Sequence, residues 1–418
     1  MRVAFYGNTA NNFFAVARAI RRASAIDAHL FIDSDAAWGQ LPEREDPELQ
    51  HGYPDWIHKG SYHSMLSRFW PGRSPLVKEL ESFDVVMVSG GGVRLAPFVD
   101  RPFIFYVTGW DLTVAPFPVR FLTRNPGVVR KLGALLGGFW QRRGIKAVDQ
   151  LWSQPFSPFA TAAKRLAVEP ARIQARYFPI MIDTDVYRPD PAARESSDPL
   201  IRRLVDDFDF IVFHPTRMML NQSPEYVETG QWKGNDRLFA GFAKFIADNP
   251  GVRPVLALIE HAPSPDMDQA KALVRRLGIE KNVVWMKGPH AHGFDRIALL
   301  PFYAAADVVV DEFGIGWFGS IVVEGLSTGK PVLCYVDADV MKQLYPWNPI
   351  LSPRSPSEIA TTLAELWRDP AARRAIGDRG RAWAVEFHSI ANVGAKYVRE
   401  VAELAASVPA RAAEQQPA

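Results

Sequence analysis

The sequence predicts an α/β protein with two doubly wound domains that face each other across a deep cleft. Its 418 residues exceed the roughly 250 to 300 at which a single hydrophobic core stops growing. Short apolar runs rich in β-forming residues alternate with helical patterns through both halves, which is typical of parallel sheets covered by helices. A stretch rich in proline and charge at 187–199 separates the two series and predicts a linker.

Both halves contain a series of candidate strands. In the first half they lie at 3–6, 29–32, 84–88, 103–107, 151–153 and 176–178, and in the second at 208–213, 254–259, 283–286, 308–310 and 332–335. We expect a first domain at 1–187 and a second at 188–385. A helix at 386–408 is expected to pack back towards the first domain, and residues 409–418 to form a disordered tail. Because ligands of open α/β sheets bind beyond the carboxyl ends of the strands, the chemistry is expected in the loops that follow them.

Composition excludes several classes of protein. The formal net charge of +2 argues against a nucleic-acid binder with a strongly basic face. The single cysteine, Cys334, cannot form an intrachain disulfide or a cysteine metal cluster, which favours a reducing, cytoplasmic setting. The amino terminus resembles a first strand rather than a signal peptide, and no run of about 18 apolar residues predicts a membrane span.

The segment 311–336, DEFGIGWFGSIVVEGLSTGKPVLCYV, is the strongest candidate binding motif. An apolar strand leads into a glycine-rich loop, followed by a helix that is expected to begin near Gly319 and Ser320. Such a loop lets the backbone approach a ligand, and the helix amino terminus favours an anion such as a diphosphate. Glu324, about one turn into the helix, can accept hydrogen bonds from ribose hydroxyls. A loop that only closes a βα unit explains the spacing equally well.

This segment resembles the retaining family 4 glycosyltransferases, which have the GT-B fold of two facing Rossmann-like domains. The matching residues are Phe318, Gly319, Glu324, Gly329, Pro331 and Val332. The family's first acid, which contacts the donor sugar, is replaced by Gly316, and Glu312 is the candidate substitute. Shorter matches follow the family order over 151–389. The resemblance implies that Gly316, Phe318, Gly319, Ser320, Glu324 and Glu312 contact the donor.

Two cations form the second signal. Arg217 follows a strand end, and Lys233 with Gly234 precedes a helix. Together they can neutralise a diphosphate leaving group without a metal ion. The family carries this pair a few residues apart, whereas fifteen residues separate the two cations here, which indicates an inserted loop. Solvated surface positions are the alternative reading for both.

The first half carries weaker candidates after its strands. The loop GNTANN places Gly7, Asn8 and Asn11 where the family has a glycine-containing loop facing the cleft. The loop lacks the G-x-G-x-x-G motif, which argues against a dinucleotide-dependent dehydrogenase. The segment VTGWDL resembles a family motif in which Thr108 takes a histidine's place beside Gly109 and Asp111. Thr108, Gly109 and Asn11 are candidate acceptor or sugar contacts, and Gly7 and Asn8 candidate donor contacts. Asp111 is a candidate catalytic residue or simply a helix cap.

Two stretches with interleaved aromatic and basic residues, 67–73 and 115–146, suggest an acceptor surface. Such a surface can rest on lipid headgroups or grip an anionic lipid carrier. An ordinary helix with one packed and one wet side is the alternative.

The resemblance implies transfer of a sugar from a nucleotide diphosphate sugar to a hydroxyl of a glycan, glycolipid or small glycoside, with retention and without metal or cofactor. The expected partners are the nucleotide sugar donor and a hydroxyl acceptor, which can be lipid-linked. A peripheral contact with the inner face of the membrane is compatible with this expectation. No nucleic acid is expected as a partner. Two alternatives stay open. One is a nucleotide-sugar epimerase of the same fold, and the other a non-catalytic protein that binds a sugar nucleotide or glycan.

Overall fold

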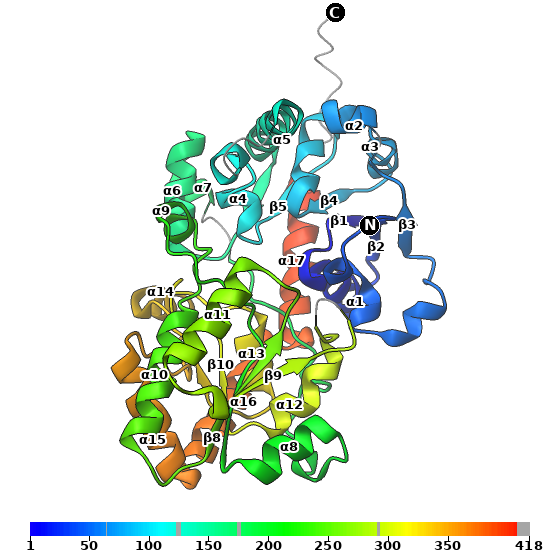
Figure 1. Ribbon diagram of the computed structural model, residues 1–418. Helices are drawn as coiled ribbons and strands as arrows, with labels where there is room; N and C mark the ends of the chain where they lie inside the picture. The colour runs from blue at the N-terminus through cyan, green and yellow to red at the C-terminus, as the bar shows by residue number, and fades with distance from the viewer. Residues whose placement is uncertain (64, 123–126, 174–176, 291–292, 408–418) are drawn as a thin grey trace, which may run out of the picture. The chain divides into compact units, whose positions relative to one another are not determined.

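The computed structural model describes residues 1–63, 65–122, 127–173, 177–290 and 293–407. The chain divides into two compact units (Figure 1). The N-terminal unit comprises Met1–Met181 together with Ile390–Ala418, and the C-terminal unit comprises Ile182–Ser389. The chain therefore passes between the units twice.

The N-terminal unit contains a six-stranded parallel sheet in the order β3-β2-β1-β4-β5-β6. The strands are β1 Arg2–Tyr6, β2 Asp27–Asp33, β3 Ile57–Gly60, β4 Val85–Val88, β5 Phe103–Tyr106 and β6 Gln150–Trp152. Strands β4 and β5 are fully buried and β1 is buried except for its first residue, as expected when helices cover both faces. The strand order reverses between β1 and β4, which makes this point the switch point of the sheet.

Two helices distant in sequence cover one face of this sheet. Helix α1, Asn12–Ala23, packs along α17, Ile390–Ser407, which runs in red beside it in Figure 1. Tyr397 of α17 reaches Phe178, whose ring stacks on Trp152 with centroids 3.8 Å apart. The remaining helices of the unit are α2 Met65–Phe69, α3 Pro75–Leu80, α4 Trp110–Thr113, α5 Val128–Ala147, α6 Ser157–Leu166 and α7 Pro170–Ile173.

The C-terminal unit contains a five-stranded parallel sheet in the order β11-β10-β7-β8-β9. Its strands are β7 Phe210–His214, β8 Pro254–Glu260, β9 Val283–Lys287, β10 Val308–Val310 and β11 Val332–Leu333. The order reverses between β7 and β10, so this sheet also has a switch point.

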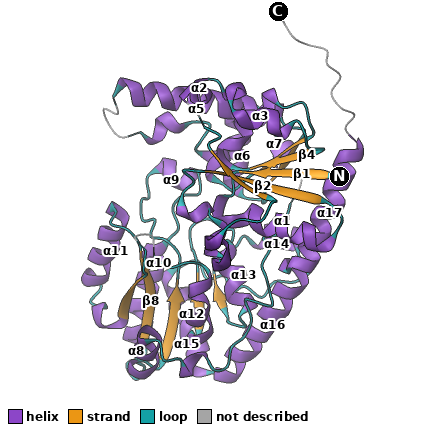
Figure 2. Ribbon diagram, turned by 90° about the vertical axis from the view of Figure 1, so that its right-hand side faces the viewer, coloured by secondary structure: helices purple, strands orange, loops and turns teal. Residues whose placement is uncertain are grey.

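Helices cover both faces of this second sheet (Figure 2). Helix α10, Asn235–Asp248, packs with α11, Pro265–Arg276, and α15, Pro356–Arg368, over Val212 and Leu256. The neighbouring Phe213 points the other way and meets Tyr303 of α12, Leu300–Ala305. The other helices are α8 Pro199–Asp207, α9 Pro224–Glu228, α13 Ser320–Ser327, α14 Ala338–Leu344 and α16 Pro370–His388.

Three sequence-based expectations need correction. Strand β3 was not expected, because IHKG is short and half polar. For the strand expected at 176–178, residue 176 lies outside the described residues, and Tyr177 and Phe178 are not in a strand. The linker expected at 187–199 lies inside the C-terminal unit. Tyr187 is buried there, and its carbonyl accepts hydrogen bonds from Ser327 Oγ and Arg381 Nη1.

The carboxyl-terminal segment divides between the two units. The first domain was expected to end at 187, whereas the N-terminal unit ends at Met181 before the chain returns at Ile390. The segment expected at 386–408 therefore begins in α16 of the C-terminal unit and continues as α17 of the N-terminal unit. The expected disordered tail, 409–418, lies outside the described residues. No described helix has the length and apolar character needed to cross a membrane.

Replacing Tyr397 with alanine is expected to destabilise the N-terminal unit by about 3–5 kcal/mol, because a fully packed aromatic ring is removed from the contact between α17 and the sheet. Unfolding by urea, followed by fluorescence, measures the loss. The exposed Arg399 on the same helix gives the matched control, Arg399→Ala, which should change stability by less than about 0.5 kcal/mol. Equal effects of the two substitutions would contradict the packing described.

Candidate functional site

Polar and charged side chains of the C-terminal unit gather beyond the carboxyl ends of β7 and β10. His214 ends β7 and is followed by Thr216 and Arg217, while Asp311 and Glu312 follow β10. The strand order of the sheet reverses between these two strands. In open α/β sheets such a switch point opens a crevice in which ligands bind.

A buried ion pair joins Lys233 to Glu312 at this edge. Backbone contacts bring the two residues together, because the amide of Phe313 donates to the carbonyl of Lys233 at 2.8 Å. Gly234 has φ +68°, and a side chain there would come within 2.8 Å of the Phe313 backbone. A glycine is therefore required for the loop before α10 to approach the loop after β10.

Burial and charge act against each other in this pair. Burial raises the pKa of Glu312 to about 7, although the ammonium group of Lys233 opposes the rise. Burial also works to lower the pKa of Lys233, but the charges of Glu312 and Asp311 outweigh it and leave that pKa raised. Lys233 is therefore a largely shielded ammonium group whose charge is stabilised by an acidic partner. Such an arrangement is costly unless both charges stay paired.

Arg217 lies near this pair but forms no ion pair with either described residue. Its side chain is exposed and has no hydrogen bond or ion pair with a described residue, yet its charge acts on both Lys233 and Glu312. This edge thus presents one exposed guanidinium near one half-buried ammonium group. Two converging cations suit a ligand that carries two negative charges close together.

Hydrogen bonds among buried polar groups connect the ends of β7 and β10 at this edge. Thr216 Oγ1 donates to the Asp311 carboxylate, which links the ends of β7 and β10. His214 Nδ1 lies 2.9 Å from the carbonyl of Val310, and its Nε2 lies 3.0 Å from Asn235 Nδ2. The carbonyl can only accept, so the proton is on Nδ1 and Nε2 accepts from the amide. Burial lowers the pKa of His214 to about 4.

The glycine-rich loop, residues 314–319, follows Asp311 and Glu312 and leads from β10 to α13. Gly316 has φ +84°, which favours glycine, and its carbonyl accepts the amide of Asp337 at 2.8 Å. Phe318 is buried against Trp383 and His388, so its ring stabilises the loop from below. Helix α13 begins at Ser320 behind Gly319, with no side chain capping its amino terminus. The first amides of the helix therefore lack a side-chain acceptor.

Glu324 lies inside α13 and is 2% exposed. Its Oε1 accepts from Arg296 Nε at 2.6 Å and its Oε2 from the hydroxyl of Tyr303 at 2.6 Å. Each carboxylate oxygen has a second lone pair. A ribose bound here would therefore share Glu324 with Arg296 and Tyr303, or displace one of them.

In the N-terminal unit the candidate residues lie at the corresponding edge, after β1, β4 and β5. Gly7 has φ +86°, and a side chain there would come within 2.3 Å of the Ser89 carbonyl oxygen. Asn8 and Asn11 are buried and bonded to each other at 2.7 Å, and they donate to the carbonyls of Gln40 and Leu41. These asparagines hold the loop after β1 against the following segment.

Asp111 is a buried acceptor that fastens two loops. Its carboxylate accepts from the amides of Thr108, Gly109 and Gly90, and from the hydroxyl of Thr108 at 3.1 Å. Burial raises its pKa to about 6, while these hydrogen bonds oppose the rise. The arrangement gives Asp111 a positioning role between the loops after β4 and β5. Thr108 and Gly109 remain half-buried at the surface of this edge.

Comparison with solved structures identifies the architecture. HepE from Anabaena, solved with UDP, aligns with a TM-score of 0.63 at 16% identity, covering 96% of this chain and 100% of its own. Sucrose-phosphate synthase from Thermosynechococcus elongatus aligns with a TM-score of 0.63 at 14% identity over 98% and 100%. A glycosyltransferase from Rickettsia africae aligns with a TM-score of 0.64 at 12% identity over 97% and 99%. The chain has the GT-B fold. No protein-family profile and no curated relative matches it.

Within this GT-B chain, the structure brings Arg217, Lys233 and Glu312 together at one switch point, while Asp111 and Thr108 lie in the other unit. Sequence reasoning missed Arg296 and Tyr303, the partners of Glu324, and Thr216, the partner of Asp311. No local motif marks these three residues, since each meets its partner only through the fold. Within the described residues, no group of three or more His, Cys, Asp or Glu side chains is arranged to hold a metal ion.

The buried His214 predicts a loss of stability in acid. Its folded-state pKa lies below the usual 6.5, so the unfolded chain binds more protons between the two values and stability falls as pH falls through this range. The His214 component of this loss from pH 7 to pH 5 should be about 2 kcal/mol. Glu312 and Asp111 act in the opposite direction over the same range, because their raised pKa values make the folded chain bind more protons. Urea unfolding at both pH values therefore measures the component as the difference between the wild type and His214→Gln, and the exposed His51→Gln is the control; the same pH dependence in the wild type and the His214 variant would contradict the assignment.

Proposed function

We propose that this protein is a glycosyltransferase of the family 4 type that moves a sugar from a nucleotide diphosphate sugar to a hydroxyl acceptor, with retention and without a metal ion. The observation that carries the proposal is the exposed Arg217 beside the half-buried Lys233 at the β7/β10 switch point of a GT-B fold. The fold is shared with HepE, which has been solved with UDP and with UDP-glucose, and this likeness supports a nucleotide-sugar donor.

The diphosphate is the group that this site fits best. Arg217 can contact it from the exposed side, and Lys233 can exchange Glu312 for a phosphate oxygen without becoming an unpaired charge. The released Glu312, whose pKa burial raises to about 7, can then become neutral by binding a proton. The first amides of α13, behind Gly319 and Ser320, have no capping side chain and add a partial positive charge. We assign Glu324 to the ribose hydroxyls. Glu312, once released from Lys233, is left beside the position that the sugar would occupy.

The reaction requires the bond between the anomeric carbon and the diphosphate to break while a bond to the acceptor oxygen forms on the same face of the sugar. The two cations stabilise the charge that develops on the departing diphosphate. The acceptor proton then passes to the departing phosphate oxygen, which needs no protein base. This route is consistent with Thr108 in the position where the family has a histidine, because threonine cannot act as that base.

A panel of nucleotide sugars, beginning with UDP-glucose, tests the proposal by thermal shift and by nucleotide release. Arg217→Ala should weaken donor binding about tenfold or more, because a charge-assisted contact is lost. Glu324→Gln keeps one carbonyl acceptor for Tyr303 and should also weaken binding. Arg253→Ala is the matched control, since Arg253 is exposed and pairs with Asp209 at the opposite, amino end of β8.

Three outcomes would contradict the proposal. Unchanged donor binding in both the Arg217 and Glu324 variants would refute the site. Interconversion of two donors without nucleotide release would indicate an epimerase. Donor binding with no product from any hydroxyl acceptor would indicate a binding protein.

A further inference from the structure

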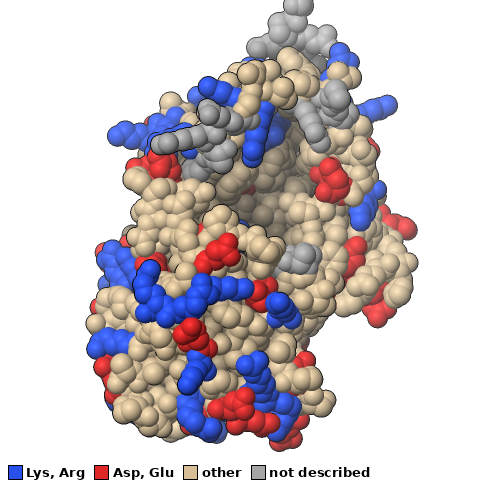
Figure 3. All heavy atoms as spheres, in the orientation of Figure 1, with Lys and Arg blue, Asp and Glu red and all other residues tan. Residues whose placement is uncertain are grey.

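The N-terminal unit contains a cavity of about 640 Å³ at the carboxyl edge of its sheet. Tyr6 at the end of β1, Gly91 after β4 and His63 after β3 contribute to its lining. The cavity therefore lies at the β1/β4 switch point, the counterpart of the cation site in the other unit. Figure 3 shows a hollow below α5 on this face, with walls formed mostly by uncharged residues.

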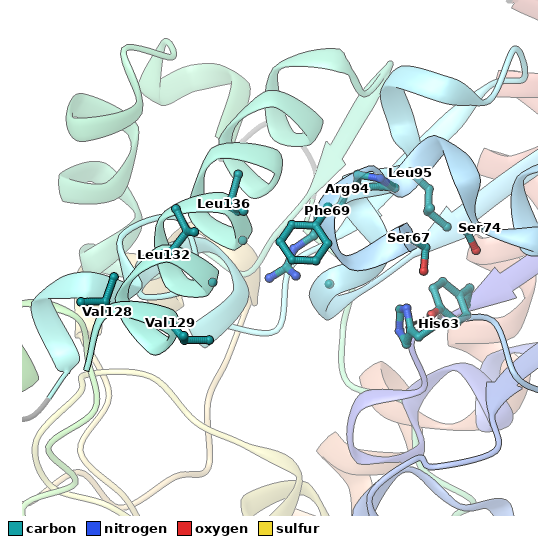
Figure 4. Close-up of a pocket in the computed structure, with 15 residues that line it drawn as sticks. His63, Ser67, Phe69, Ser74, Arg94, Leu95, Val128, Val129, Leu132 and Leu136 are labelled. Atoms are coloured by element: carbon teal, nitrogen blue, oxygen red, sulfur yellow. Dashed lines mark hydrogen bonds between the residues drawn. The ribbon is translucent and has the colours of Figure 1, made fainter. Parts of the chain in front are cut away.

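One wall of the cavity is an aliphatic face of α5. Val128, Val129, Leu132 and Leu136 line it (Figure 4). Val128 and Val129 are 84% and 87% exposed, and Leu132 is 52% exposed. Large aliphatic side chains gathered at a concave surface mark a place where apolar groups of a ligand are buried.

Two glycines keep space open on the same wall. Gly133 and Gly137 line the cavity one helical turn apart, although glycine inside a helix costs about 1 kcal/mol relative to alanine. A side chain at Gly133 would meet nothing within 4 Å. The packing of the protein itself therefore does not require glycine at this position.

The cavity also holds a cation without an acidic partner. Arg94 projects its guanidinium between α5 and Phe69 (Figure 4), and its Nε donates to the amide oxygen of Gln141 at 2.9 Å. It makes no ion pair with a described residue, and no Asp or Glu is among the described residues that line the cavity. Burial lowers the pKa of Arg94, yet arginine stays charged in proteins. A half-buried cation of this kind favours an anionic ligand group.

We infer that this cavity binds the acceptor and that the acceptor is an anionic amphiphile, with its charged group on Arg94 and its apolar chain against α5. That the ligand is the acceptor of the transfer reaction rests on the proposed function. The ligand chemistry rests on the cavity alone. A ligand with only an anionic group or only an apolar chain would bind weakly, because the aliphatic wall and the guanidinium line the same space.

Calorimetric titration with decyl phosphate, below the concentration at which it forms micelles, tests the inference. We expect one molecule to bind per chain, while inorganic phosphate and decyl maltoside bind at least tenfold more weakly because each lacks one half of the ligand. Gly133→Leu should weaken decyl phosphate binding at least tenfold by filling the cavity, and Arg94→Gln should do so by removing the charge. Leu135→Gln is the control, because Leu135 is 50% exposed on α5 but does not line the cavity.

Two further measurements distinguish a failure of this inference from misfolding of the variant and from a failure of the proposed function. Gly133→Leu should unfold thermally at or above the wild-type temperature, since leucine favours the helix, so weaker binding cannot arise from misfolding. Titration with UDP should give equal affinities for the wild type and Gly133→Leu. Failure of every nucleotide sugar of the panel to bind the wild type would refute the proposed function and leave the amphiphile result standing. Decyl phosphate binding that Gly133→Leu leaves unchanged would overturn the inference.

Discussion

The ion pair between Lys233 and Glu312 is the interaction on which the C-terminal site depends. Both side chains are largely removed from water, so each needs the other while no ligand is present. A ligand with a phosphate oxygen can take the place of Glu312 without leaving Lys233 unpaired. The ion pair therefore keeps the cation charged and in position, and the loops that carry it need not form when the ligand arrives.

Close backbone contacts make this pair geometrically possible. The loop before α10 and the loop after β10 touch through Gly234 and Gly314, where added side chains would collide with the opposite backbone. The Phe313 amide fixes their register by bonding to the Lys233 carbonyl. The same use of glycine recurs in the N-terminal unit, where Gly7 lies against Ser89 between the loops after β1 and β4. Each unit thus places its polar residues at the reversal of its strand order.

The fold could be predicted because its central strands are buried on both faces and appear as short, continuous apolar runs, such as VVV in β10. The GT-B expectation is confirmed. Strand β3 gave no such signal, and the proline-rich stretch after Tyr187 suggested a linker although buried contacts tie it to the C-terminal unit. Composition reports local stiffness and polarity, whereas a domain boundary depends on long-range contacts.

The candidate site was predictable only in part. Arg217, Lys233 and Glu312 follow or precede strands and helices, so the rule for open sheets places them at one edge. Arg296 lies 28 residues before Glu324 and Tyr303 lies 21 before it, at distances where no helical or strand period connects them. Arg94 gave no signal, because the absence of an acidic partner is visible only when the whole cavity is assembled.

Calorimetric titration of UDP into Glu312→Gln and Lys233→Met tests the central claim most directly, because UDP carries the diphosphate without the sugar. Glutamine removes the competitor for Lys233 with little change of shape. We expect UDP to bind the Glu312 variant about tenfold more tightly than the wild type and the Lys233 variant at least tenfold more weakly. Equal UDP affinity in all three proteins would show that the ion pair has no part in binding the diphosphate.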